Sequence, residues 1–198
     1  EILIGLVGSE MCIRDRVCIP SIYQDELGAV WLGTTEGLNR YNGKDVKVFQ
    51  PSESNHGLTN NEINELCGDK NGRMYIRSGN DLIKLDIYTE QFTCLRQKGV
   101  YGLFCKKDTL WVSCADGIYY YTGQGTELTF FARVQKGFVG RALYVDRETV
   151  WVVTRKYLVA ISREDPLRQE ILLTPVSYTH LRADETDQYL VCRLLLEK

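Results

Sequence analysis

Histidine and proline are scarce in this 198-residue sequence, and neither sign of charge is in excess. Each of these features excludes some classes of function. There are two histidines and four prolines, and 24 basic residues nearly balance 26 acidic ones. The net charge of −2 gives no electrostatic footprint for nucleic acid, because Lys and Arg are scattered rather than grouped. No apolar run approaches the roughly 18 residues that a membrane span needs. We therefore expect neither nucleic-acid binding nor membrane contact by this chain.

The two terminal segments, residues 1–16 and 175–198, differ in character from the middle. Residues 7–16 can be encoded by the mosaic end of a transposon-based sequencing adapter, and residues 176–181 by the same element read on the opposite strand. Residues 190–198 resemble the translated flow-cell end. Between these two stretches, Asp184 departs from the adapter by a single base. We interpret both segments as adapter-like artefacts without a fold. The remainder carries 19 basic and 19 acidic side chains.

An aromatic residue flanked by aliphatic ones recurs four times in the middle of the chain. Its positions are Trp31, Tyr75, Trp111 and Trp151, at intervals of 44, 36 and 40 residues. Intervals of this size are typical of the blades of a β-propeller. The repeat is therefore the strongest fold signal in the sequence.

Each repeat predicts four short strands. The first leads to an Asp-containing turn, in which the carboxylate can accept backbone N–H groups. The aromatic strand follows, and a second tight turn ends at Gly37 in the first unit and at Gly117 in the third. Fourth strands are expected at residues 46–49, 92–95 and 128–131.

The aromatic strands favour a propeller over an up-and-down barrel. The segments 30–32 and 150–153 are continuous apolar runs, which indicate a sheet covered on both faces. A propeller blade lies between two neighbours, whereas a barrel strand would alternate more cleanly. We predict an all-β fold of four four-stranded blades in an incomplete ring, with apolar faces left uncovered at its two ends. The blades are expected at about 17–56, 57–98, 99–138 and 139–174.

Motifs for catalysis, metal binding and nucleotide binding are lacking. His56 is the only histidine outside the terminal segments, and a Ser or Cys nucleophile usually needs such a base. No Cys-x-x-Cys or His-x-x-x-His motif indicates a metal site. The glycines recur at turns rather than in a phosphate-binding loop. We expect no metal, no cofactor and no enzymatic activity.

Five cysteines lie between the terminal segments, and an odd number argues against a complete disulfide framework. Cys105 and Cys114 flank the predicted hairpin of the third blade and could face each other. We favour the other interpretation, in which the cysteines are free thiols that act as small apolar side chains.

Candidate ligand-binding residues lie on the loops of one rim, since functional residues concentrate on loops over a rigid scaffold. The turns between second and third strands and the loops between blades are expected to emerge there together. Amides and charges beside aromatic residues suit sugar-like ligands, although the same residue types are ordinary in turns. The candidates are Asn60, Asn61, Asn80, Asp81, Asp116, Arg155 and Lys156.

The segment 25–41 resembles the two-component regulator propeller repeat. It reads Asp-x-x-Gly-x-Val-Trp-Leu-Gly-Thr-x-x-Gly-Leu-Asn-Arg-Tyr, and residues 57–63 are similar to the same family's entry into the next blade. The resemblance covers residues 22–161. Later units drift from the pattern, with Tyr75 in place of Trp and Arg77-Ser78 in place of Gly-Thr.

The resemblance implies the periplasmic sensor region of a hybrid two-component histidine kinase of the Bacteroidetes type. It implies a small-molecule ligand, often an oligosaccharide, whose binding alters the packing of a homodimer. No kinase element is present in this sequence, so the chain itself is expected to be non-catalytic. A protein-interaction scaffold is the alternative function, and a glycan-active propeller enzyme is a weaker one because paired carboxylates are not visible. The flanking gene sequence would separate the three.

Overall fold

The computed structural model describes residues 18–51, 57–134, 139–154 and 157–173. Within these ranges all regular secondary structure is β, in sixteen strands that form four antiparallel sheets of four. No helix in this part of the chain has the length and apolar character needed to cross a membrane. Both adapter-like segments lie outside the described residues, as do His56, Arg155 and Lys156.

The four sheets follow one another along the chain, each with its strands in sequence order. The first contains β1 (Ser21–Gln24), β2 (Val30–Thr34), β3 (Gly37–Tyr41) and β4 (Val46–Phe49). The second contains β5 (Ile63–Gly68), β6 (Arg73–Ser78), β7 (Asp81–Asp86) and β8 (Gln91–Arg96). The third contains β9 (Val100–Lys106), β10 (Thr109–Cys114), β11 (Gly117–Tyr121) and β12 (Thr129–Ala132). The fourth contains β13 (Val139–Val145), β14 (Thr149–Thr154), β15 (Leu158–Ser162) and β16 (Gln169–Leu173).

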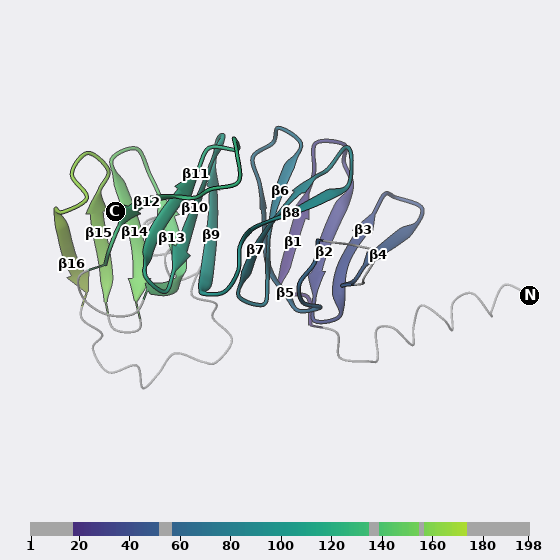
Figure 1. Ribbon diagram of the computed structural model, residues 1–198, viewed down its shortest axis with the longest axis horizontal. Coiled ribbons are helices and arrows are strands. Elements are labelled where there is room, and N and C mark those ends of the chain that lie inside the picture. The colour runs from purple at the N-terminus through teal and green to yellow at the C-terminus, as the bar shows by residue number, and fades with distance from the viewer. Residues whose placement is uncertain (1–17, 52–56, 135–138, 155–156, 174–198) are drawn as a thin grey trace, which may run out of the picture.

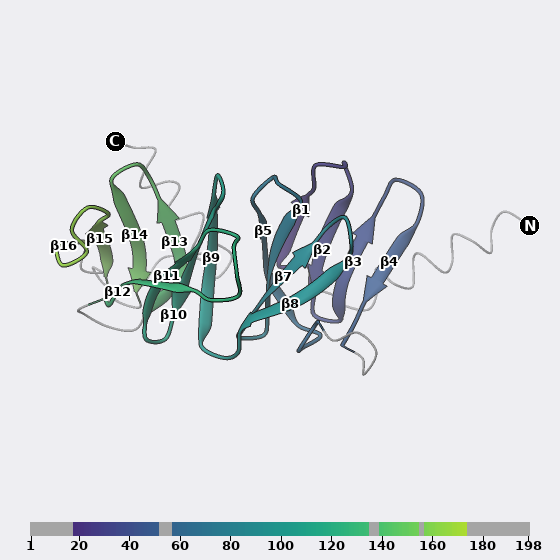
Figure 2. The ribbon, with the colours of Figure 1, turned by 45° about the horizontal axis from the view of Figure 1, so that its top comes forward.

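The sheets pack face to face as the blades of an open propeller arc. The first strands of successive sheets contact each other, β1 with β5, β5 with β9 and β9 with β13. Figures 1 and 2 show β4 and β16 at opposite ends of the molecule, so the first and fourth blades do not meet. The predicted all-β fold of four four-stranded blades in an incomplete ring is confirmed.

The repeated aromatic residues occupy the same strand of every blade. Trp31 lies in β2, Tyr75 in β6, Trp111 in β10 and Trp151 in β14. Each of these strands is the second of its sheet and pairs with the first and third strands. The sequence interval between aromatic residues is therefore the length of one blade.

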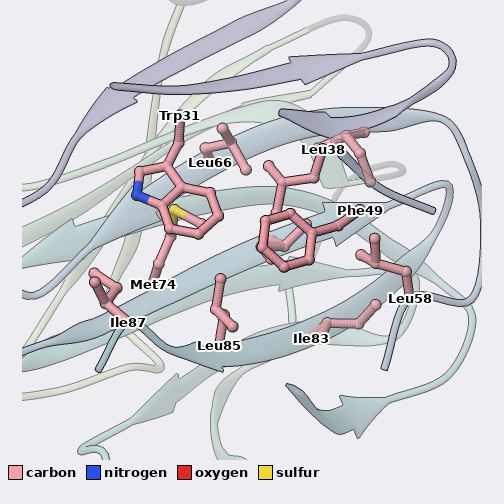
Figure 3. Packing of buried hydrophobic residues seen from close by; sticks show 11 residues of the cluster. Trp31, Leu38, Phe49, Leu58, Leu66, Met74, Ile83, Leu85 and Ile87 are labelled. Carbon is pink, nitrogen blue, oxygen red and sulfur yellow. The ribbon is translucent and has the colours of Figure 1, made fainter. Parts of the chain in front are cut away.

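Three apolar clusters fill the three interfaces between neighbouring blades. Between the first and second blades, Trp31 stacks on Phe49 with ring centroids 5.7 Å apart, and both face Met74 and Leu85 of the second blade. Figure 3 shows these side chains interleaved between the two sheets. Equivalent clusters form around Tyr75 between the second and third blades and around Trp111 between the third and fourth. Trp31, Tyr75 and Trp111 are thus each covered by the blade that follows.

The burial pattern of the second strand differs between blades that have one neighbour and blades that have two. In β6 and β10, every residue after the first is buried. In β14, buried and partly buried residues alternate strictly, and β2 begins with the same alternation. The continuous apolar runs at 30–32 and 150–153 are therefore covered on one face only, because they belong to the two end blades.

The repeat glycines begin the third strands where the backbone passes close to the fourth strand. A Cβ atom at Gly37 would lie 2.6 Å from the carbonyl oxygen of Phe49, and one at Gly117 would lie 2.6 Å from that of Ala132. Backbone atoms cannot move away at low cost, so a side chain is excluded at both positions.

An aspartate organises the turn between the first and second strands. Asp25 accepts the backbone N–H groups of Leu27 and Ala29 through Oδ1, at 3.0 and 2.8 Å, and the Trp31 indole N–H through Oδ2 at 2.8 Å. Asp146 repeats the arrangement in the fourth blade, with the Trp151 indole 2.8 Å from Oδ2. One carboxylate therefore fixes both the turn and the orientation of the aromatic ring.

We expect this arrangement to make stability depend on acid pH. Burial raises the pKa of Asp146, but hydrogen bonds from Trp151, Glu148 and Thr149 and the charge of Lys106 outweigh it and hold the pKa below its usual range. A carboxylate with a lowered folded-state pKa stabilises the fold above the unfolded pKa of about 3.9, and that contribution is lost as pH falls through the folded value. The free energy of unfolding should therefore fall as the pH is lowered below about 4.

The Asp146→Asn variant should lose about 1–2 kcal/mol of stability at neutral pH and show a shallower decline in acid. Urea titrations between neutral pH and the acid range measure both effects. Asp45→Asn, in the exposed turn between β3 and β4, is the control. An unchanged acid profile for Asp146→Asn would contradict this role.

Cys105 and Cys114 do not face each other, and the five cysteines of the described residues are free thiols. Cys105 lies opposite Leu110, whereas Cys114 lies opposite Val100 at the other end of the same hairpin. The two residues are separated because they lie near the connected and the open ends of the β9–β10 ladder, respectively. The structure instead brings Cys105 against Cys67 of the preceding blade.

Candidate functional site

One rim of the arc is formed by the turns between second and third strands and by the connections between blades. Backbone hydrogen bonds tie the two kinds of segment together. The N–H of Gly79 donates to the carbonyl of Glu62 at 2.7 Å, and the N–H of Ala115 donates to that of Gly99 at 2.8 Å. The loops that lead into a blade therefore hold that blade's own hairpin turn.

Four of the predicted ligand residues gather at the β6–β7 turn. Asn60 exchanges hydrogen bonds with Ser78, whose hydroxyl donates to the Asn60 carbonyl at 2.7 Å and accepts the Asn60 N–H at 3.0 Å. The Asp81 carboxylate accepts the N–H of Lys98 at 2.6 Å. Asn60 and Asp81 thus support the rim backbone. Asn61 and Asn80 are exposed, and their side chains make no hydrogen bond to another described residue.

Asp116, on the β10–β11 turn, is engaged within the protein. Its Oδ1 accepts the Arg96 guanidinium at 2.8 Å and its Oδ2 accepts the Tyr119 hydroxyl at 2.7 Å. The guanidinium also lies over the Tyr119 ring, 4.6 Å from its centroid. Burial raises the pKa of Asp116, but the bonds from Tyr119 and Arg96 outweigh it and leave the pKa below its usual range. Asp116 therefore links the second blade to the third.

A buried ion pair that the sequence analysis missed lies beside the β6–β7 turn of the second blade. The Nε of Arg77 is 3.3 Å from Oε2 of Glu65, and the two side chains are only 8% and 13% exposed. Glu65 also accepts the N–H of Leu103 from the third blade at 3.1 Å. The Nη1 of Arg77 donates to the carbonyl of Gly79, in the rim turn that carries Asn80.

The repeat itself could have revealed this pair. The strand position of Arg77 is occupied by Gly33, Ser113 and Val153 in the other blades, and none of these carries a charge. In the first blade a Cβ atom at this position would lie 2.9 Å from the Ile63 side chain. A cation where the equivalent residues are small or neutral indicates a role beyond blade packing.

The chemistry available at this rim is that of polar binding. Amides, a desolvated ion pair and backbone carbonyls can exchange hydrogen bonds with a hydroxyl-rich molecule. Among the residues that the structure describes, no three His, Cys, Asp or Glu side chains converge on a point where a metal ion would fit.

Comparison with known proteins supports the fold. No protein-family model matches the sequence, and no curated protein matches it. Two solved structures are extracellular domains from B. thetaiotaomicron, each described as part of a hybrid two-component system. One is 20% identical with a TM-score of 0.64 and is matched over 78% of this chain and 24% of its own length. The other is 21% identical with a TM-score of 0.62, over 85% of this chain and 23% of its own.

The computationally designed Ika4 protein is a further structural neighbour. It is 13% identical with a TM-score of 0.52, over 81% of this chain and 93% of its own length. All three likenesses define the fold of the arc. This chain spans about a quarter of the two extracellular domains that it resembles.

Proposed function

We propose that this chain is part of the extracytoplasmic, ligand-sensing propeller of a two-component signalling receptor and is not itself catalytic. The likeness to two extracellular domains of such systems, at 20% and 21% identity, supports this function. The match of residues 25–41 to the repeat pattern supports it from the sequence side. In the intact receptor, ligand binding would alter the packing of a periplasmic homodimer.

The buried Glu65–Arg77 pair is the observation that supports a binding role for this rim. A desolvated ion pair contributes little to stability compared with apolar residues of the same volume. Here the pair positions the carbonyl of Gly79 and reaches the backbone of the next blade. It therefore fixes the rim turn from which the amide of Asn80 projects.

The proposed ligand is an oligosaccharide held by the exposed amides of Asn61 and Asn80. A primary amide offers two donors and an acceptor, which suits vicinal hydroxyl groups. Asn60 and Asp81 hold the backbone beneath these amides, so the two groups are presented on a fixed turn. Pre-organisation of this kind reduces the entropic cost of binding.

The double variant Asn61→Ala/Asn80→Ala tests this function. Loss of two neutral hydrogen bonds at about 1 kcal/mol each should weaken binding about 30-fold. Isothermal titration against a panel of size-matched neutral and uronic-acid oligosaccharides measures the affinity. The melting temperature should be unchanged, because both side chains are exposed.

Gln124→Ala is the matched control, since it removes an exposed amide from the β11–β12 loop at the opposite rim. It should leave the affinity unaltered. Oligosaccharide binding that the double variant retains in full would place the ligand elsewhere. If no saccharide of the panel binds, the scaffold alternative is favoured.

A further inference from the structure

Two free cysteines meet across the interface between the second and third blades. The Sγ atoms of Cys67 in β5 and Cys105 in β9 lie 2.8 Å apart. Both residues are partly buried against the apolar cluster that contains Tyr75 and Leu110. The contact therefore joins the two inner strands of neighbouring blades.

The strand register places these side chains at the same interface independently of the sulfur contact. Cys67 lies opposite Tyr75 on the face of the second blade that the third blade covers. Cys105 lies opposite Leu110 on the face of the third blade that the second covers.

The interface between the first and second blades shows that the strand positions of Cys67 and Cys105 lie against each other in this repeat. The positions of Cys67 and Cys105 correspond to Tyr23 and Gly68 at the interface between the first and second blades. There the Tyr23 hydroxyl covers Gly68 so closely that a Cβ atom on the glycine would lie 2.1 Å from it. The large side chain of Tyr23 on the first blade thus lies over a residue of the second blade, Gly68, that has no side chain. At the second interface, two thiols replace that pair.

We propose that Cys67 and Cys105 are a modification site, at which a disulfide links the second and third blades. The oxidant is another disulfide, either a low-molecular-weight one or that of a thiol–disulfide oxidoreductase. The proposal goes beyond the sensing function and does not depend on it. An extracytoplasmic location would supply such an oxidant.

The disulfide forms by thiol–disulfide exchange in two steps. One of the two thiols, as the thiolate, attacks a sulfur of the oxidant, forms a mixed disulfide and releases one thiol. The second cysteine, again as the thiolate, attacks the protein sulfur of that mixed disulfide and releases the second thiol. The protein loses two hydrogens, and the oxidant is reduced to two thiols.

A peptide map of the unsubstituted chain tests the site directly. The chain is incubated with oxidised glutathione, its remaining thiols are alkylated, and it is digested with trypsin without reductant. Each of the five cysteines outside the terminal segments falls on its own tryptic peptide. We expect the peptide 48–70, which holds Cys67, to be joined to the peptide 99–106, which holds Cys105.

Thermal unfolding provides the second readout. Closing the 67–105 segment should raise the melting temperature of the oxidised protein by roughly 10 °C over the reduced one. Cys105→Ser should abolish both the linked peptide and the shift. Cys94→Ser, in the outer strand β8, should retain both and is the matched control.

Three results would overturn the proposal. The first is recovery of Cys67 and Cys105 only as alkylated thiols or as separate glutathione adducts. The second is a link from either residue to Cys18, Cys94 or Cys114. The third is a temperature shift that persists in Cys105→Ser.

Discussion

Replacing Trp31 by alanine should destabilise the protein by about 5 kcal/mol, which is comparable to the whole stability of many domains. The indole is fully buried between the first and second blades. Its removal leaves a cavity and also deprives the buried Asp25 carboxylate of a hydrogen bond. Urea unfolding followed by circular dichroism should show a large decrease in the urea concentration at the midpoint, or a chain that is unfolded without denaturant.

Trp151→Ala is the matched comparison within the same molecule. Trp151 makes the same indole bond to an aspartate at the same strand position, but no described blade covers its ring. It should cost about 2 kcal/mol, since less apolar surface is lost from the interior. Equal losses for the two variants would mean that the following blade does not cover Trp31 as described.

The chain should also associate with itself, end to end, as its concentration rises. The outer face of the first blade exposes Ile22, Val46 and Val48, at 64%, 59% and 55%. The outer face of the fourth blade carries Trp151. Within the arc, faces of these two kinds pack against each other at all three interfaces. Such a contact between unlike surfaces can repeat, which favours open oligomers and poor expression.

The double variant Ile22→Lys/Val48→Lys should shift the chain to monomer, because two charges would have to be buried at the contact. Sedimentation velocity over a dilution series measures the distribution. Leu167→Lys is the control, since Leu167 is 80% exposed in the β15–β16 connection. A chain that stays monomeric at all concentrations would show that its end faces do not pair.

The sequence was sufficient to predict the blades because their determinants are local and repeated. An aspartate turn, an aromatic strand and a glycine turn each specify a short piece of backbone, and four copies fix the spacing. The expected fourth strands at 46–49 and 92–95 lie within β4 and β8, and that at 128–131 is one residue early against β12. The last outer strand, β16, was expected within residues 139–174 but its position was not predicted, because Gln169 and Glu170 interrupt its apolar pattern.

The site was less predictable because its contacts run between blades. The side-chain oxygen of Asn60 accepts the N–H of Glu62, whereas the side chain of Asn80 stays exposed, and composition does not reveal this difference. The ion pair of Arg77 depends on a bulge in β5 that shifts Glu65 relative to its partner strand. The contact of Cys105 was unpredictable for the same reason, because Cys67 lies in another blade.

Fluorine NMR of the chain labelled with 5-fluorotryptophan tests most directly whether each blade shields the aromatic ring of the one before it. The three tryptophans of the sequence lie in the second strands of three different blades. In the monomeric Ile22→Lys/Val48→Lys variant, a soluble paramagnetic agent should broaden the Trp151 signal strongly and spare Trp31 and Trp111, which are 0% and 5% exposed. Equal broadening of all three signals would contradict the stacked arrangement.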